Sequence, residues 1–349
     1  MKTSFGNRLR QSVRFALLML LAGSPSGCGL LIDAAQLFAP IPAPPDGVDV
    51  VCRHRQLEVG ISVEPYPPFV FPVVETSRGP SVTGLDLELV QQLGTALSRY
   101  CGGTPITVVP HVVHFRDLFR LLTEGHLDLF VSSVAYNVPH LKSAGLAYSA
   151  PYYPATGLGA IARQPELVQR VRAALVHPTN DGGGLERRRA ALDGLVVAVQ
   201  EGRSAHFYAA ANLKHARLLL CDSLAGAWQQ QDPPVDVILG KHPVLDFLLN
   251  REEQLKTWQP VLLEDGRPFL LNREFFTVVM SEKSFRLHWL VNDLLFELEE
   301  SGRLEAMQRR WFEQDYHYAE RAVSEGLLAV IPTSVDPTAR SRCHWAQAQ

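Results

Sequence analysis

The sequence contains no transmembrane segment beyond its N-terminus, because no later stretch reaches the roughly 18 uninterrupted apolar residues that a membrane-spanning helix needs. It has only five cysteines among 349 residues, without the Cys-x-x-Cys spacing or the histidine clusters of a metal site. It also lacks the basic patch that is typical of nucleic-acid-binding proteins. What remains is ordinary globular composition, 46% hydrophobic, in a chain long enough for two domains.

The N-terminus has the pattern of a signal peptide, which we predict over residues 1–27. An apolar run from Phe15 to Gly23, too short to span a bilayer comfortably, follows four basic residues, Lys2, Arg8, Arg10 and Arg14. Removal of this leader takes away four of the 33 basic residues and no acid, which leaves 29 against 36 and a net charge of −7. That acidic balance argues against a nucleic-acid partner.

Cys28 directly follows Pro25, Ser26 and Gly27, and a small residue before a cysteine at this place resembles a bacterial lipoprotein processing site. Pro25 departs from the aliphatic residue that is usual at that position. The alternatives are a lipid anchor on Cys28, or ordinary cleavage nearby that removes Cys28 or leaves it free. The proline-rich residues that follow predict a linker over 28–52.

The four remaining cysteines favour disulfides in an exported chain, although sequence alone permits three pairings. We predict the pairs Cys52–Cys101 and Cys221–Cys343. Cys52 lies just before the first predicted strand and Cys101 just after the first predicted helix, so both belong at the same edge of one βα unit.

The stretch 57–69 combines a short strand, which we predict over about 57–63, with a stiff aromatic loop. Leu57, Val59 and Ile61 alternate with smaller or polar residues, which is strand periodicity. Three prolines then force the chain out of the sheet, and ligands of open α/β sheets bind just beyond the carboxyl ends of strands. Tyr66 and Phe69 are therefore candidates for the mouth of a site, or else they fill a local core.

The rest of the chain alternates predicted strands and helices, which indicates parallel α/β units. A polar turn at 76–83 precedes a helix that begins at Gly84 and ends at Gly102. We expect further strands at 106–109, 127–131, 157–162, 195–199, 216–220, 235–239 and 275–280, and further helices at 115–122, from 205, at 244–249, 287–299 and 303–312.

Eight fragments in this order resemble the family 3 extracellular solute-binding proteins, the amino-acid-binding receptors of ABC importers with the type II periplasmic fold. They are Leu57-Glu-Val-Gly with Tyr66-Pro-Pro-Phe69, Gly84-Leu-Asp-Leu-Glu-Leu89, Gly125-His-Leu-Asp128, Ser149-Ala-Pro-Tyr-Tyr153, Val196-Val-Ala-Val-Gln-Glu-Gly202, Val235-Asp-Val-Ile-Leu239, Pro243-Val-Leu245, and Ser301-Gly-Arg-Leu-Glu305 with Trp311-Phe312. The resemblance covers roughly residues 55–315.

The resemblance implies an α/β fold of two lobes, each a mostly parallel sheet flanked by helices, which close on a solute by hinge motion. Lobe 1 would comprise 53–155 and a return segment with its C-terminal helices, 275–317. Lobe 2 would comprise 156–274, two crossover strands would join the lobes, and 318–349 would form a tail.

The resemblance also places candidate ligand contacts at the ends of lobe 1 strands. Tyr66 falls where the family has a ring against the ligand, and Phe115 where a second apolar contact lies; the alternative is that both belong to the lobe 1 core. Ser132 and Ser133 would offer hydroxyl and backbone groups to a polar solute, unless they only cap a strand end.

Three departures from the family pattern concern charge. The arginine that clamps the ligand carboxylate is missing, and His140 is its best equivalent, with Lys142 as another candidate. Gly202, Arg203 and Ser204 replace a glycine and two hydroxyl residues at a helix N-terminus that could bind an anion, although Arg203 could instead be solvated. Lys241 stands where the family has an aspartate for the ligand ammonium, so it faces an anionic group or points away.

These departures predict a solute other than a standard free α-amino acid, such as a small polar, anionic molecule. We expect a monomeric periplasmic or extracytoplasmic receptor without cofactor or metal, which meets ABC permease subunits in the inner membrane and touches the membrane only through a Cys28 anchor. Two alternatives remain on the same fold. One is an enzyme resembling cyclohexadienyl dehydratase, with Glu64 or Glu201 as the acid, and the other is a ligand-free accessory or sensor protein.

Overall fold

The computed structural model describes residues 46–136, 145–175, 192–251, 257–313, 318–336 and 342–347. Within these ranges the chain forms two α/β lobes, each with its own six-stranded sheet, and a separate three-stranded sheet. The two-lobed architecture predicted from the sequence is confirmed, with one refinement. Both sheets are mixed, because antiparallel strands flank their parallel centres.

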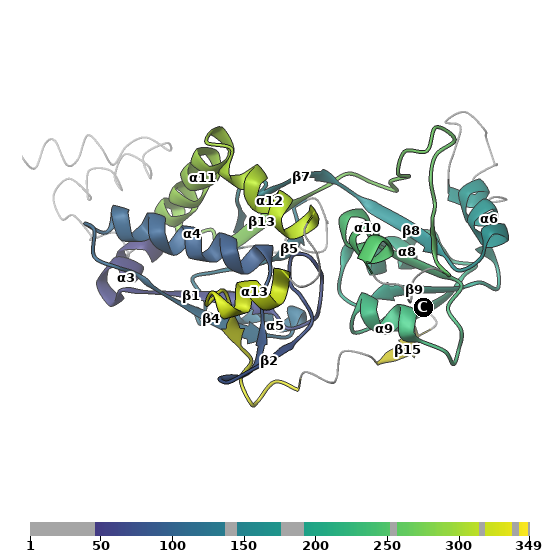
Figure 1. Ribbon diagram of the computed structural model, residues 1–349, viewed down its shortest axis with the longest axis horizontal. Helices are drawn as coiled ribbons and strands as arrows, with labels where there is room; N and C mark the ends of the chain where they lie inside the picture. Colours follow the sequence, from purple (N-terminus) through teal and green to yellow (C-terminus); the bar gives the residue numbers. More distant parts are fainter. Residues whose placement is uncertain are drawn as a thin grey trace, which may run out of the picture. The chain divides into compact units, whose positions relative to one another are not determined.

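The sheet of lobe 1 has the strand order β4-β1-β5-β13-β6, and β7 also pairs with β13. β1 is parallel to β4 and β5, whereas β13 runs antiparallel to β5, β6 and β7. The strands are β1 (Gln56–Ser62), β4 (Thr107–Val113), β5 (Leu129–Ala135), β6 (Leu146–Tyr148), β7 (Tyr153–Thr156) and β13 (Glu274–Ser281) (Figure 1).

Helices cover both faces of this sheet. Leu57, Val59 and Ile61 pack into the same core as the leucines of α4, while Phe130 packs on the other face with Phe115 of α5. The helices of lobe 1 are α3 (Gly47–His54), α4 (Leu85–Tyr100), α5 (Phe115–Thr123), α11 (Phe285–Glu300), α12 (Arg303–Glu313) and α13 (Tyr318–Ser324).

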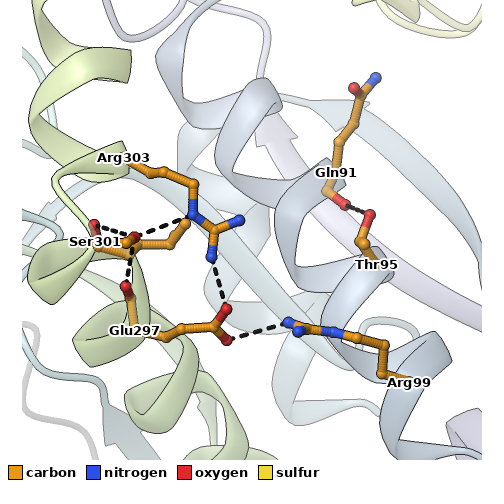
Figure 2. Close-up of polar contacts among 7 residues, drawn as sticks. Gln91, Thr95, Arg99, Glu297, Ser301 and Arg303 are labelled. Carbon is orange, nitrogen blue, oxygen red and sulfur yellow. Dashed lines mark hydrogen bonds and ion pairs between the residues drawn. The ribbon is translucent and has the colours of Figure 1, made fainter.

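A surface network ties the return helices to α4. Glu297 of α11 accepts hydrogen bonds from Arg99 of α4 at 3.1 Å and from Arg303 of α12 at 2.7 Å, as Figure 2 shows. These two guanidinium groups, Arg99 first, lower the pKa of Glu297. The contact joins segments almost 200 positions apart in one lobe.

The sheet of lobe 2 has the order β12-β8-β11-β9-β10-β15. α6 and α8 pack on one face and α9 and α10 on the other. Its elements are β8 (Leu158–Ala162), α6 (Pro165–Leu175), β9 (Val196–Gln200), α8 (Ser204–Asn212), β10 (Arg217–Cys221), α9 (Leu224–Gln229), β11 (Val237–Lys241), α10 (His242–Arg251), β12 (Gln259–Pro260) and β15 (Cys343–Trp345) (Figure 1).

Two neighbouring strands carry the chain between the lobes. β7 leads from lobe 1 into β8, and β13 returns from lobe 2; they pair through Glu274 with Thr156 and Phe276 with Tyr153. This pairing places the start of β13 at the hinge, next to the cleft.

Three predicted segments differ from the structure. The linker predicted over 28–52 is wrong at its end, because Asp46 caps the N-terminus of α3 and Val48 and Val51 are buried. The polar turn predicted at 76–83 is largely a hairpin of β2 (Val74–Thr76) and β3 (Gly79–Val82). The tail forms α13, then β14 (Ala329–Val330), which pairs with β3, and β15, which pairs with β10 of lobe 2.

The structure contains both predicted disulfides, Cys52–Cys101 and Cys221–Cys343. The first joins α3 to the end of α4, and the second fixes β15 at the edge of the lobe 2 sheet. No helix in the described ranges combines the length and apolar character that crossing a bilayer requires. The same ranges bring together no group of three His, Cys, Asp or Glu side chains suited to a metal ion.

Candidate functional site

The loop after β1 presents Tyr66 to lobe 2. The Tyr66 amide donates to the Val70 carbonyl at 2.7 Å and the Val70 amide donates back at 3.1 Å, so the proline-rich loop is closed by its own backbone. Phe69 belongs to the lobe 1 core, where its ring packs edge-on against Phe276 and Phe312. Of the two rings that the sequence singled out in this loop, only Tyr66 faces the partner lobe.

Arg203, the residue before α8, reaches from lobe 2 into an aromatic slot of lobe 1. Its guanidinium carbon lies 3.5 Å from the ring centre of Phe115 and 4.6 Å from that of Tyr66. One guanidinium nitrogen donates to the Ser132 carbonyl at 2.7 Å. The side chain is buried, its residue only 3% exposed. Guanidinium stacked on ring faces is a favourable cation–π geometry.

Asp86 forms a buried acidic node behind this slot. It accepts hydrogen bonds from the Tyr152 hydroxyl at 2.7 Å and from the Ser133 hydroxyl at 3.3 Å. Burial raises the pKa of Asp86 to about 7, although the Tyr152 hydrogen bond and the Arg203 charge oppose that rise. Asp86 therefore titrates near neutral pH instead of staying ionised.

Glu64 is a second buried carboxylate, and it anchors the start of α5. It accepts hydrogen bonds from the Ser62 hydroxyl, from His114 at 2.9 Å and from the Phe115 amide at 3.0 Å. Burial alone would raise its pKa, but these hydrogen bonds, His114 first, lower it below the ordinary value. An ionised Glu64 with three donors holds Phe115 in place.

Lys241, the last residue of β11, forms a buried ion pair with Glu274 at the start of β13. Glu274 is fully buried and also accepts hydrogen bonds from Ser204 at 3.2 Å and Asn272 at 2.7 Å. Burial, followed by the Arg203 charge, lowers the pKa of Lys241, while the Glu274 carboxylate favours its ammonium form. This pair fixes lobe 2 to the hinge strand.

The two serines at the end of β5 are oriented by a local irregularity of the strand. The register of β5 against β13 shifts in this region, and Ser133 adopts a left-handed backbone with φ 51°. The Ser132 hydroxyl accepts from the Ser62 amide at 2.9 Å, and the Ser133 amide donates to the Tyr152 hydroxyl at 3.1 Å. Their hydroxyls therefore have intramolecular partners, and the Ser132 carbonyl faces Arg203.

Around Arg203, described side chains of the two lobes contact each other directly. A cavity with a volume of about 10 Å³, the scale of one water molecule, is lined by residues from both: Phe115, Ser133, Val134, Ala135, Arg203, Ser204 and Lys241. Sites that hold small molecules usually measure several hundred Å³. Around Arg203, the described residues of the two lobes are therefore in contact, whereas a larger cavity of about 340 Å³ lies beside β7 and is lined by Tyr153, Thr156 and residues of lobe 2.

The structure thus brings seven of the nine predicted ligand contacts to one place: Tyr66, Phe115, Ser132, Ser133, Arg203, Ser204 and Lys241. Gly202 forms the turn before α8 with φ 74°, and its amide bonds His206 at 3.2 Å. His140, like Lys142 and Cys28, lies outside the described residues.

Sequence reasoning missed Asp86 and Glu274 as members of the site. Asp86 carried one signal, an acid on the buried side of a helix start between Leu85 and Leu89. Glu274 carried none, because it is an acid beside an arginine that looks like an ordinary surface residue.

The sequence profile of the bacterial extracellular solute-binding proteins, family 3, matches residues 57–314, more than half of the chain. No curated protein matches the chain by sequence. Among solved structures, the ancestral amino acid-binding protein AncCDT-1, a precursor of cyclohexadienyl dehydratase, is similar at 18% identity and a TM-score of 0.58, over 77% of this chain and 100% of that one.

Two further structures show the same fold. An amino acid ABC transporter substrate-binding protein, AbpA from Streptococcus pneumoniae, bound to L-arginine, has 18% identity and a TM-score of 0.60 over 76% of this chain and 98% of its own. The GluR0 ligand-binding core with L-glutamate has 18% identity and a TM-score of 0.54 over 74% and 98%. The profile and the two-lobed architecture agree with the fragments found in the sequence, and the chain belongs to the bacterial extracellular solute-binding proteins, family 3.

Proposed function

We propose that this protein is the extracytoplasmic receptor of an ABC importer and binds a small anionic solute between its lobes. The chain is a solute-binding protein of the amino-acid ABC transporter type, a class whose members are generally binders without enzymatic activity. The nature of the solute and the docking to permease subunits of the inner membrane are the proposed parts.

The main support for an anionic solute is that the buried guanidinium of Arg203 has few hydrogen-bond partners and no ion-pair partner among the described residues. Its guanidinium donates one hydrogen bond, to the Ser132 carbonyl, and its buried Nε has no hydrogen-bond partner within the described part of the chain. Among those residues no carboxylate lies within ion-pair distance of it, although Glu64 and Asp86 attract it from farther away. A planar guanidinium with free donors suits the two oxygens of a carboxylate.

The carboxylates around the cleft argue against a free α-amino acid. An amino group needs an acceptor, but Glu274 already pairs with Lys241, and Glu64 holds His114 and the start of α5. Asp86 accepts from Tyr152 and Ser133. None of these acids lines the cavity, whereas Arg203 and Lys241 do. The cavity wall therefore offers the Arg203 guanidinium and no unengaged acid, since Lys241 is already paired with Glu274.

Calorimetry against a panel of small carboxylates, such as acetate, succinate and glutarate, and against the standard amino acids tests this proposal. We expect a carboxylate to bind, and Arg203→Gln to weaken it about 10- to 100-fold, as the loss of a charge-assisted hydrogen bond predicts. The matched control is Arg217→Gln, which removes an exposed arginine that stacks on Trp345. Micromolar binding of an ordinary amino acid that is unaffected by Arg203→Gln would refute the proposal.

The dehydratase alternative requires a proton donor in the cleft. Glu64 has a lowered pKa and three hydrogen-bond donors around it, and Glu201 is exposed near His344, so neither has the character of a buried general acid. Incubation with prephenate, followed by detection of phenylpyruvate, separates this activity from simple binding.

A further inference from the structure

The guanidinium of Arg203 belongs to lobe 2, yet its contacts are with lobe 1. Phe115 and Tyr66 lie against it at 3.5 and 4.6 Å, and the Ser132 carbonyl accepts its hydrogen bond. These three partners come from the start of α5, the loop after β1 and the end of β5. One side chain therefore bridges the cleft in the manner of a bound molecule.

Among the described residues, the cavity that Arg203 lines is no larger than a water molecule. The remaining cavity measures about 10 Å³ and Arg203 itself is part of its wall. The lobes thus meet through groups of the chain itself.

We propose that Arg203 is a built-in ligand: its guanidinium occupies the aromatic slot of Tyr66 and Phe115 and closes the cleft when no solute is present. Opening the lobes would withdraw the guanidinium from both rings and from the Ser132 carbonyl. The inference rests on the proposed receptor function of this cleft, but it does not depend on the charge of the solute.

The built-in ligand lowers the apparent affinity of the cleft for any solute. A solute binds only to molecules in which the lobes have opened and Arg203 has left the slot, so its apparent affinity falls in proportion to the open fraction. Removal of the arginine would raise that fraction, but it would also remove the donor proposed for an anionic solute, so these two effects on solute affinity oppose each other and the distance between the lobes is the direct measure of the open fraction. Removal of the arginine would also leave the slot free for a guanidinium compound supplied from solution.

The test uses solute-free full-length protein with spin labels on Gln91→Cys in α4 and Lys214→Cys in lobe 2, both exposed positions. We expect the unsubstituted Arg203 protein to show a single short distance, and Arg203→Ala to gain a longer one. Methylguanidinium at millimolar concentration should restore the short distance in Arg203→Ala and leave the parent unchanged. Methylammonium, a cation without the planar fork, should not restore it.

Two further variants keep the result interpretable. Arg203→Lys retains the charge but loses the planar stacking, so we expect an intermediate share of the longer distance, while Arg217→Ala should behave like the parent. Circular dichroism checks that each variant is folded, and if Arg203→Ala fails to fold, Arg203→Lys with methylguanidinium replaces it. Equal distances in the parent and the Arg203 variants, or equal responses to methylguanidinium, would overturn the inference. A failed carboxylate panel would not, because no solute enters this experiment.

Discussion

We expect the raised pKa of Asp86 to make the free energy of unfolding depend on pH. Asp86 lies at the start of α4, fully buried, and burial raises its pKa to about 7 from the ordinary value of 3.8. In the unfolded chain the carboxyl group is exposed to water and returns to that ordinary value. The folded protein therefore keeps a proton that the unfolded chain loses between pH 4 and 7.

The sign and size of the effect follow from this difference. Because the folded state binds more protons in this range, the free energy of unfolding falls as pH rises from 4 to 7 and then levels off. A difference of about 3 pKa units corresponds to about 4 kcal/mol, or about 1.4 kcal/mol per pH unit near pH 5.5. The stabilisation from Asp86 is fully present below pH 4 and is lost as pH passes 7.

The comparison with Asp86→Asn isolates this contribution. An asparagine can accept from the Tyr152 hydroxyl and donate to the Ser133 hydroxyl, but it does not titrate. Other buried groups titrate as well: the lowered pKa of Glu64 matters as pH falls below about 4.5, and the raised pKa of His114 as pH rises above about 6.5. Burial also raises the pKa of Asp128 and lowers that of His242, which act within the window, but both proteins share these groups, so their effects cancel in the difference.

Urea unfolding of both proteins at intervals from pH 4.5 to 6.5 gives the difference in unfolding free energy. We expect the parent to lose about 2 to 3 kcal/mol relative to Asp86→Asn across this range. A flat difference would mean that Asp86 is ionised in the folded state, held by Arg203 and its hydrogen-bond donors. That outcome would refute the claim that burial dominates this site.

Two more predictions concern the hinge and the lobe 1 core. Lys241→Met and Glu274→Leu should each cost about 3 to 5 kcal/mol because a buried charge stays unpaired, whereas the double variant should unfold in urea close to the parent; simple addition of the two losses would contradict a buried pair. Gly60→Ala should cost about 1 to 3 kcal/mol because its Cβ would lie 2.6 Å from a methyl carbon of Leu118. The control Gly159→Ala, whose nearest contact is 3.5 Å, should change the thermal midpoint little; equal effects would refute the packing argument.

Periodicity predicted the main strands closely because their burial pattern is local. β1 was expected at 57–63 and spans Gln56–Ser62, and β13 was expected at 275–280 and spans Glu274–Ser281. Strands that are buried on both faces have near-continuous apolar runs of this kind. Order and spacing of the fragments then indicated the two-lobed fold.

Short elements that depend on distant partners were missed. β3 contains a glycine and a proline, and it is held by β2 and by β14, which comes about 250 positions later. β15 exists at the edge of lobe 2 through its pairing with β10 and the disulfide to Cys221. Nothing in the local sequence of these segments favours a strand, so only tertiary contacts specify them.

In the site, too, residues marked by local sequence were predicted, whereas contacts between distant segments were not. Tyr66, Ser132 and Lys241 were found because each lies at or just beyond the end of a strand, and their contact with a solute stays a prediction. The contact between Arg203 and the Ser132 carbonyl spans 71 positions and depends on closure of the lobes. No sequence pattern could state that the arginine of one lobe would fill the aromatic slot of the other.

Lys241 shows that the charge of one replaced residue does not predict the charge of the ligand unless its neighbours in the fold are known. A lysine where relatives have an acid suggested an anionic ligand, yet the structure supplies the counter-charge from Glu274, 33 positions later on the return strand. A buried ammonium needs such a partner, so the two residues form one unit of the hinge, and Lys241 keeps little charge for a solute. Arg203 has no comparable partner among the described residues. The proposed binding of an anionic solute therefore depends on Arg203, and under the built-in-ligand proposal such a solute would compete with Tyr66 and Phe115 for it.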